Sequence, residues 1–328
     1  MRQSRIVIAL AMTGVVSSDG AGQATTPGAR RLASMVYDAA HREMILFGGI
    51  APESIGDSES PNDLWAWNGR AWRRIDAGGK AAPAGRAAAH MVYDVGRGRV
   101  VLFGGRQRGN DPRNPDILGD LWEWDGQHWT SMESAGTPAL LHAATAYDPV
   151  HKRVLMFGGL DARGFSRSLR AYDGKGWTML DSLGPRNIVP AMGAVDANGD
   201  FLLVTNTPSG DRDPTPDSSV TWVWGSGTWA RAEYAPPLAN LQPTASAPNG
   251  EIYFYQVQER WLTAPLMHVR SSTGKWTTLT SPPGPGYYGA ASAYDTDRKR
   301  FVLFGVARTS TQHDGETWEF DGRDWVKR

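Results

Sequence analysis

An arginine and a histidine four positions apart, Arg86 and His90, are the residues best suited to ligand chemistry, and they precede an apolar run. A guanidinium offers paired N–H donors that match a carboxylate, and an imidazole can exchange a proton near neutral pH. Together they could hold an anionic group. The structural alternative, in which His90 caps a buried strand end and Arg86 is solvated, is the preferred interpretation. The candidate ligand-binding residues, all expected at one end of the predicted strands, are Arg86, His90, Arg106, Arg108, His142, Asn187, Tyr287 and Tyr288.

Metal binding has one weak candidate, the carboxylates Asp211, Asp213 and Asp217. Short spacing of carboxylates suits Ca²⁺, but the segment lacks the glycine and the terminal glutamate of an EF-hand loop. A solvated loop is therefore the preferred interpretation. The seven histidines include no pair at zinc-ligand spacing, and nucleophile-elbow, H-E-x-x-H and phosphate-loop motifs are absent. We predict no cofactor and find no catalytic motif, which leaves enzymatic activity open but disfavoured.

A motif of about 50 residues that returns six times must position these side chains. Each copy ends in a tryptophan, and three copies carry a glycine doublet after an apolar run. The tryptophans are Trp72, Trp129, Trp177, Trp229, Trp276 and Trp325, and the doublets are Gly48-Gly49, Gly104-Gly105 and Gly158-Gly159. Glycines allow a positive φ and a close approach of two backbones, and a buried tryptophan supplies a large apolar surface. We therefore expect both sets to be structural.

The second copy shows the predicted strands most clearly: strand A over 87–93, B over 99–103, C over 120–124 and D over 128–132. Strand B is a continuous apolar run, as expected of a strand buried on both faces. Asp125-Gly126 between C and D is a hairpin signal. Antiparallel order places the A–B and C–D turns on one face, and the B–C loops and D–A linkers on the other. Asp38, Asp94, Asp148 and Asp295 recur after strand A and are expected to be turn residues.

The doublet, the strand-C aromatic and the strand-D tryptophan resemble the kelch repeat, as found in exported bacterial kelch-like proteins. The resemblance implies an all-β, six-bladed kelch-type β-propeller with four antiparallel strands per blade. It also implies ligand binding at the mouth of the central channel, on the B–C loop face. We expect a single domain over 25–328, with blades near 30–77, 86–133, 141–181, 189–232, 243–280 and 288–328. Copies four and five match the repeat weakly, and the sequence does not show how the ring closes.

The first 24 residues have the organisation of a signal peptide, with Arg2 and Arg5, an apolar stretch, and small residues before a cut near Ala24. We therefore expect export to the periplasm or medium and no membrane span in the mature chain. Lys and Arg together number 34, as do Asp and Glu. This balance argues against nucleic acid as a partner. The chain contains no cysteine, so it forms no disulfide. A monomer is expected.

These observations favour an exported binding or interaction module whose ligand is a carbohydrate or a protein, held by the channel mouth and the B–C loops. Two alternatives stay open. One is a sugar-acid isomerase resembling N-acetylneuraminate epimerase, which would use an arginine for the carboxylate and an acid–base pair near the sugar. The other is a structural scaffold in the cell envelope.

Overall fold

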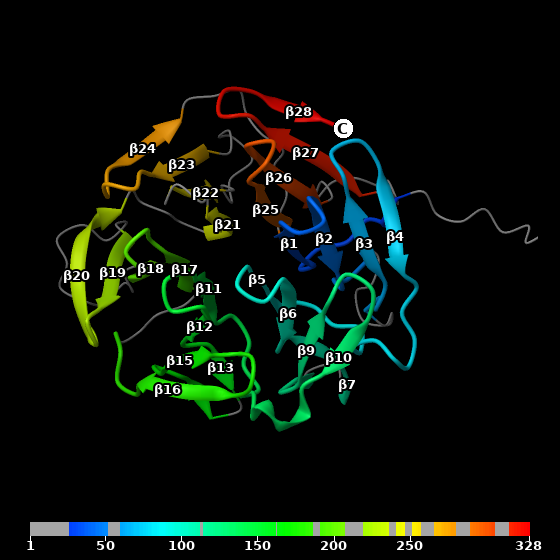
Figure 1. Cartoon of the computed structure of the whole chain (residues 1–328), viewed down its shortest axis with the longest axis horizontal. Coiled ribbons are helices and arrows are strands. Elements are labelled where there is room, and N and C mark those ends of the chain that lie inside the picture. Colours follow the sequence, from blue (N-terminus) through cyan, green and yellow to red (C-terminus); the bar gives the residue numbers. More distant parts are fainter. Residues whose placement is uncertain are drawn as a thin grey trace, which may run out of the picture.

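The computed structural model describes residues 26–51, 60–111, 114–161, 163–185, 191–206, 219–235, 241–246, 251–256, 266–279, 289–305 and 315–328. Six four-stranded antiparallel sheets stand around a central axis, each forming one blade of a propeller (Figure 1). The predicted fold class is confirmed. Among the described residues, the one helical element is the short 3-10 turn η1 (Glu133–Ala135).

Each blade takes its four strands in sequence order, from the axis outward (Figure 1). Blade 1 consists of β1 (Ser34–Asp38), β2 (Glu43–Phe47), β3 (Leu64–Trp67) and β4 (Trp72–Asp76). Blade 2 consists of β5 (His90–Asp94), β6 (Arg99–Phe103), β9 (Leu121–Trp124) and β10 (Trp129–Ser131). Blade 3 consists of β11 (Ala144–Asp148), β12 (Arg153–Phe157), β15 (Leu169–Tyr172) and β16 (Trp177–Asp181).

Blades 4 and 5, which match the repeat weakly, keep the same topology. Blade 4 consists of β17 (Ala191–Val195), β18 (Phe201–Asn206), β19 (Ser219–Gly225) and β20 (Thr228–Ala235). Blade 5 consists of β21 (Leu241–Ser246), β22 (Ile252–Gln256), β23 (Leu266–Arg270) and β24 (Trp276–Leu279). Blade 6 consists of β25 (Ala291–Asp295), β26 (Arg300–Gly305), β27 (Glu316–Phe320) and β28 (Trp325–Lys327).

The core lies between the blades, because both faces of each sheet pack against neighbouring sheets. Val100, Val101, Leu102 and Phe103 of β6 are fully buried for this reason. In five of the six blades, the tryptophan at the start of strand D meets, edge to face, an aromatic ring near the end of strand B in the preceding blade, whereas Trp276 of blade 5 packs against Phe254 of its own blade. The pairs are Trp72 with Phe304, Trp129 with Phe47, Trp177 with Phe103, Trp229 with Phe157, and Trp325 with Tyr255. The tryptophan of the repeat is thus a contact between blades.

The glycine doublet allows strand B to end against the linker of the next blade. Gly104 has a φ of 63°, and a Cβ there would lie 2.8 Å from the carbonyl oxygen of Leu140. A side chain at this position would therefore strain the backbone and collide with the linker. This close approach explains why the doublet follows the apolar run.

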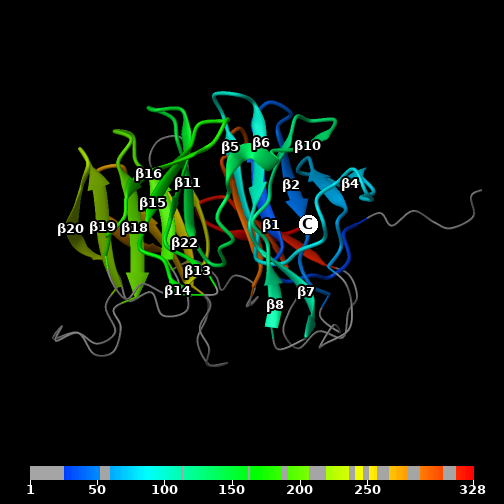
Figure 2. The same cartoon turned by 90° about the horizontal axis from the view of Figure 1, so that it is seen from below.

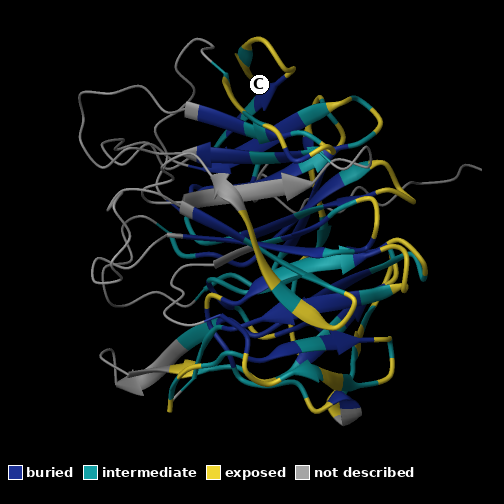
Figure 3. Cartoon of the chain, turned by 90° about the vertical axis from the view of Figure 1, so that its left-hand side faces the viewer, coloured by how far each residue is buried: buried dark blue, intermediate teal, exposed yellow. Residues whose placement is uncertain are grey.

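The two faces of the propeller carry different connections (Figure 2). One face holds the A–B and C–D turns, whose exposed residues are conspicuous along one side of Figure 3. The other holds the B–C connections, with a hairpin of β7 (Arg106–Asp111) and β8 (Asn114–Ile117) in blade 2. A second hairpin, β13 (Leu160–Asp161) and β14 (Gly164–Phe165), occupies the same place in blade 3. The predicted division of turns and loops between the faces is confirmed.

The recurring aspartate at the end of strand A organises the A–B turn, as predicted. Asp38 Oδ1 accepts hydrogen bonds from the backbone N–H groups of Ala40 and His41 at 3.0 and 3.2 Å. Asp148 and Asp295 accept equivalent pairs of N–H groups, and Asp94 accepts the backbone N–H of Arg97. His151 is a turn residue that contacts Asp148. These aspartates are structural.

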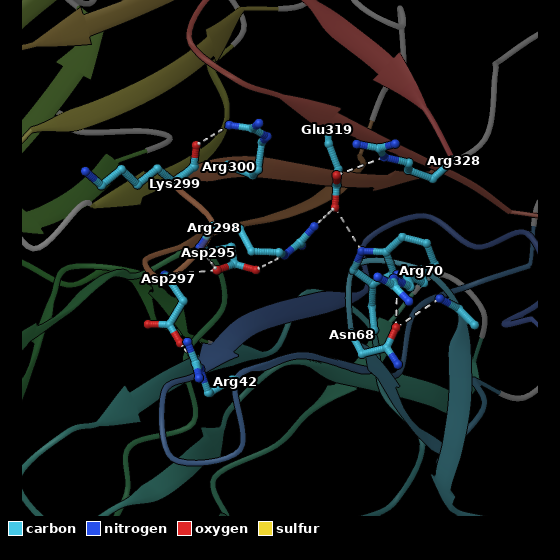
Figure 4. A network of polar contacts seen from close by, with 12 residues as sticks. Arg42, Asn68, Arg70, Asp295, Asp297, Arg298, Lys299, Arg300, Glu319 and Arg328 are labelled. Carbon is cyan, nitrogen blue, oxygen red and sulfur yellow. Dashed lines mark hydrogen bonds and ion pairs between the residues drawn. The ribbon is translucent and has the colours of Figure 1, made fainter.

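The ring closes without strand exchange, because blades 1 and 6 are each built from one continuous stretch. Side-chain contacts join blade 6 to blade 1 at this seam, where the two ends of the ring meet (Figure 4). Glu319 accepts hydrogen bonds from Trp67 across the seam and from Arg298 and Arg328 within blade 6. Trp72 donates to Thr317 Oγ1 at 2.8 Å, and the backbone N–H of Leu32 donates to the carbonyl of Gly289 at 2.6 Å.

Within the described residues, we find no helix whose length and apolar character would allow it to cross a membrane.

Candidate functional site

Arg86 braces the end of blade 2 from inside the molecule. Its guanidinium is fully buried and donates to both carboxylate oxygens of Asp120, at 2.6 and 2.7 Å. It also donates to the carbonyl oxygens of Gly104 and Ala84. Burial alone would raise the pKa of Asp120, but Arg86 and the indole N–H of Trp122 hold it below its usual value. The donors of Arg86 are therefore committed to the fold.

Blade 1 contains an equivalent arginine–aspartate pair one repeat earlier, so the pair is a structural feature of the repeat. Arg30 donates to Asp63 at 2.8 Å and to the carbonyl of Gly48 at 3.3 Å. Trp65 donates to Asp63 as Trp122 does to Asp120. Arg86 is neither solvated nor available to a ligand, so we leave it out of the site. Asp120 and Asp63 were missed by the sequence analysis, although an aspartate before the strand-C tryptophan recurs in both repeats.

His90 ties blade 2 to blade 3. It begins β5, packs its ring 5.4 Å from that of Phe103, and accepts a hydrogen bond at Nε2 from the backbone N–H of Ala143 at 3.3 Å. This acceptor role requires the neutral ring with its proton on Nδ1. Burial, followed by the charge of His142, lowers the pKa of His90 to about 4. His90 is therefore uncharged at neutral pH, as the structural alternative expected of a residue at a strand end.

His142 and Arg106 lie near the His90–Ala143 hydrogen bond and supply the accessible polar groups. His142 is exposed, with a left-handed backbone at φ 55°. Desolvation by its surroundings and the charge of Arg106 lower the pKa of His142. Arg106 begins the β7–β8 hairpin, where its backbone pairs with Ala87. Arg106 is half-buried as a residue, and its guanidinium has no hydrogen-bond or ion-pair partner among the described residues. The sequence candidates His90, His142 and Arg106 thus form one cluster.

The linkers that precede strand A form the rim of the channel mouth, and the hydrogen bonds that connect them differ at this cluster. On the blade 6, 1 and 2 side, successive linkers are joined by backbone hydrogen bonds, from Leu32 to Gly289 at 2.6 Å and from Ala88 to Leu32 at 2.8 Å. Leu32, Ala88, His142 and Gly289 all have a positive φ and occupy the same repeat position. Between blades 2 and 3, the described link is the side chain of His90 instead. The cluster therefore lies where the rim departs from its repeat.

The remaining predicted residues are not placed in this cluster. Arg108 belongs to β7, where we describe only its backbone. Asn187, Tyr287 and Tyr288, and the calcium candidates Asp211, Asp213 and Asp217, lie outside the described residues. Among residues that are described, no group of three or more His, Asp or Glu side chains could hold a metal ion.

The cluster is chemically suited to hold an anion. An arginine without an acidic partner attracts a carboxylate and can donate two parallel hydrogen bonds to it. His142 can accept a proton when a negative charge arrives between it and Arg106, because the arginine charge that lowers its pKa would then be offset. The cluster offers recognition of charge and one titratable group.

The fold defines a six-bladed β-propeller. Its structure is similar to the solved structure described as "Structure of YjhT", with a TM-score of 0.60 and 12% sequence identity. The likeness covers 93% of this chain and 99% of that chain. It establishes the fold alone. No protein-family model and no curated protein sequence matches the chain.

Proposed function

We propose that the protein is an exported kelch-type propeller that binds a carbohydrate carrying a carboxylate at the channel mouth between blades 2 and 3. The observation that carries this proposal is that Arg106 lies near enough to His142 to lower its pKa and has no acidic partner in the described part of the chain. The two residues lie where the linkers around the channel mouth depart from the pattern of the other repeats. A rigid ring of blades supports these side chains, and binding residues commonly lie on loops held by such a scaffold.

Arg106 supplies the charge recognition in this proposal, and His142 supplies adjustable hydrogen bonding. The neutral His90 holds the linker of blade 3 through Ala143 and so fixes the backbone next to His142. His90 therefore acts by positioning. Kelch identity, export and cleavage near Ala24 are parts of the same proposal, supported by the repeat and by the character of the first 24 residues.

Thermal shift and calorimetry on the mature chain, from Thr25 onward, test the proposal. The panel holds sugar acids and the neutral sugars that match them in shape. A sugar acid should raise the melting temperature, and Arg106→Ala and His142→Ala should abolish the rise. Arg163→Ala is the matched control, because Arg163 is an exposed arginine in the neighbouring β13–β14 hairpin. A rise that survives Arg106→Ala, or equal responses to acids and neutral sugars, would refute the proposed site.

A sugar-acid isomerase is the second candidate, and the pKa of His142 favours it. An imidazole that is neutral at physiological pH can serve as a general base beside a substrate carboxylate bound to an arginine. Incubation of each sugar acid that binds, followed by NMR of its ring protons, would detect a change of configuration. Binding without any such change would leave the binding module as the function.

A further inference from the structure

The tips of four consecutive A–B turns present apolar side chains to solvent, on the face opposite the proposed ligand site. Val95 and Val150 are the most prominent, with 62% and 52% of their surfaces exposed. The exposed tip residues of blades 1 to 4 are Ala39, Ala40, Val95, Pro149, Val150 and Ala197, which we call the turn arc. Turn tips usually carry Gly, Pro, Asn, Asp or Ser, so exposed valines and alanines in four consecutive turns call for an explanation.

The turn arc is continuous from blade to blade. The hydroxyl of Tyr93 in blade 2 accepts the backbone N–H of Ala40 in the turn of blade 1, at 3.1 Å. Tyr147 of blade 3 accepts the backbone N–H of Gly96 in the turn of blade 2, at 2.9 Å. A Cβ at Gly199 in the turn of blade 4 would lie 3.0 Å from the Cβ of Val150. Neighbouring tips therefore form one surface.

The turn arc is also rigid. Each tip is held from below by the aspartate of its own turn, as in the bonds from Ala40 and Val150 to Asp38 and Asp148. The tyrosine hydroxyls of the next blade add a second constraint in blades 1 and 2. A surface that is already ordered loses little conformational entropy when a partner binds.

Charge is distributed unequally around the turn arc. The four turn aspartates Asp38, Asp94, Asp148 and Asp295 are buried, so their charges are used within the fold. Basic side chains from the A–B and C–D turns of blades 1 to 3 reach solvent, and they are Arg42, Arg70, Lys152 and Lys175. The exposed acids of these turns are Asp125 and Asp173, and Arg42 pairs with Asp297 of blade 6. Exposed basic side chains therefore outnumber exposed acidic ones beside the apolar tips of blades 1 to 3.

We propose that the turn arc is a docking surface for an acidic protein segment in which carboxylates alternate with apolar side chains. The apolar residues of the segment would cover Val95 and Val150, and its carboxylates would reach Lys152. The tips carry no tryptophan or tyrosine, which anchor proteins at membrane interfaces. The imidazole rings of these turns, His41 and His151, are held by Asp38 and Asp148, and the described tips carry no larger aromatic ring on which an unpaired base could stack. A protein segment therefore fits the described tips better than a lipid surface or a nucleic acid.

Selection of peptides from a random display library tests this docking surface, because the library leaves the sequence of the partner open. The immobilised baits are the unaltered protein and a Val95→Asp/Val150→Asp double variant whose melting temperature is checked first. The selected peptides should combine acidic with apolar residues. Their affinity should fall at least about tenfold in the double variant and in Lys152→Glu, which keeps both valines, and it should weaken with added salt.

Phe165→Asp is the matched control, because Phe165 is 59% exposed in the β13–β14 hairpin on the other face. It should leave peptide affinity unchanged, as should Arg106→Ala, so this test is independent of the proposed carbohydrate site. Peptides that bind the double variant equally well, or that lack acidic residues, would overturn the proposal. So would failure to select any peptide, or binding of phosphatidylglycerol vesicles or DNA that the double variant abolishes.

Discussion

Trp67 donates a hydrogen bond from its indole to Oε1 of Glu319 over 3.1 Å, although 252 positions separate the two residues. Glu319 is almost fully buried, and Arg298 and Arg328 neutralise it from its own blade. Blade 2 repeats the arrangement, where Glu123 accepts bonds from Arg97 and from Tyr172 of the next blade. The same device that joins two neighbouring blades within the chain therefore also closes the ring (Figure 4).

Glu319→Ala should lower the free energy of unfolding by about 1–3 kcal/mol, because Trp67 and Arg298 would lose a buried acceptor. Glu316→Ala is the control on the same strand, since Glu316 contacts Lys327 and Trp318 at the partly exposed end of β27, and this change should cost less than Glu319→Ala. Urea unfolding measures both values. Equal losses would mean that the Glu319 contacts do not hold the seam.

The C–D turn glycines provide a second prediction, because they do more than allow a positive φ. A Cβ at Gly174 would lie 2.8 Å from the guanidinium of Arg97 in the preceding blade. Gly322 has a similar φ, 98° against 93°, but no atom lies within 4 Å of that position. Gly174→Ala should therefore lower the melting temperature more than Gly322→Ala, which suffers only the strain of the left-handed backbone. Identical melting temperatures would show that Arg97 moves aside freely.

The repeat made the fold predictable from sequence, because tryptophan, the glycine doublet and Asp-Gly each serve one fixed contact. In blades 4 and 5, Trp229, Trp276 and the apolar runs sufficed to predict the repeat without a glycine doublet, and the topology is as predicted. The site was harder to predict. The bond from Arg86 to Asp120 spans 34 residues, and nothing at Arg86 itself distinguishes a buried brace from a ligand donor. The link between Tyr93 and Ala40 was missed, although the Tyr-Asp pair recurs in strand A.

Protonation of His90 should destabilise the protein in acid. The folded pKa, about 4, lies below the ordinary value of 6.5, so the unfolded chain binds more protons between these values. The contribution of His90 to stability is therefore complete above about pH 6.5 and is lost as the pH falls toward 4. His90→Gln should flatten this part of the pH profile of urea unfolding. His128→Gln, on an exposed turn, should leave the profile unchanged, and a profile that both variants share with the unaltered protein would contradict the assignment.

Substitution of Arg86 should lower the stability of the protein, whereas substitution of Arg106 should abolish ligand binding. Arg86→Ala removes a buried guanidinium from Asp120 and Gly104 and should cost about 1–3 kcal/mol of unfolding free energy. Arg86→Lys should recover little, because a lysine cannot donate to both oxygens of Asp120 in parallel. Arg106→Ala breaks no described side-chain contact and should change stability by less than about 0.5 kcal/mol while abolishing sugar-acid binding.

Urea unfolding and calorimetry with the same sugar acid decide between these roles. Arg86→Lys protein that is still folded should bind the sugar acid with nearly unchanged affinity, because the bonds it loses are to Asp120 and lie within the fold. Loss of binding in Arg86→Lys with unchanged stability would instead return Arg86 to the site. The brace would then have to open to admit a ligand, and the Asp120 carboxylate would compete with the ligand for the same guanidinium.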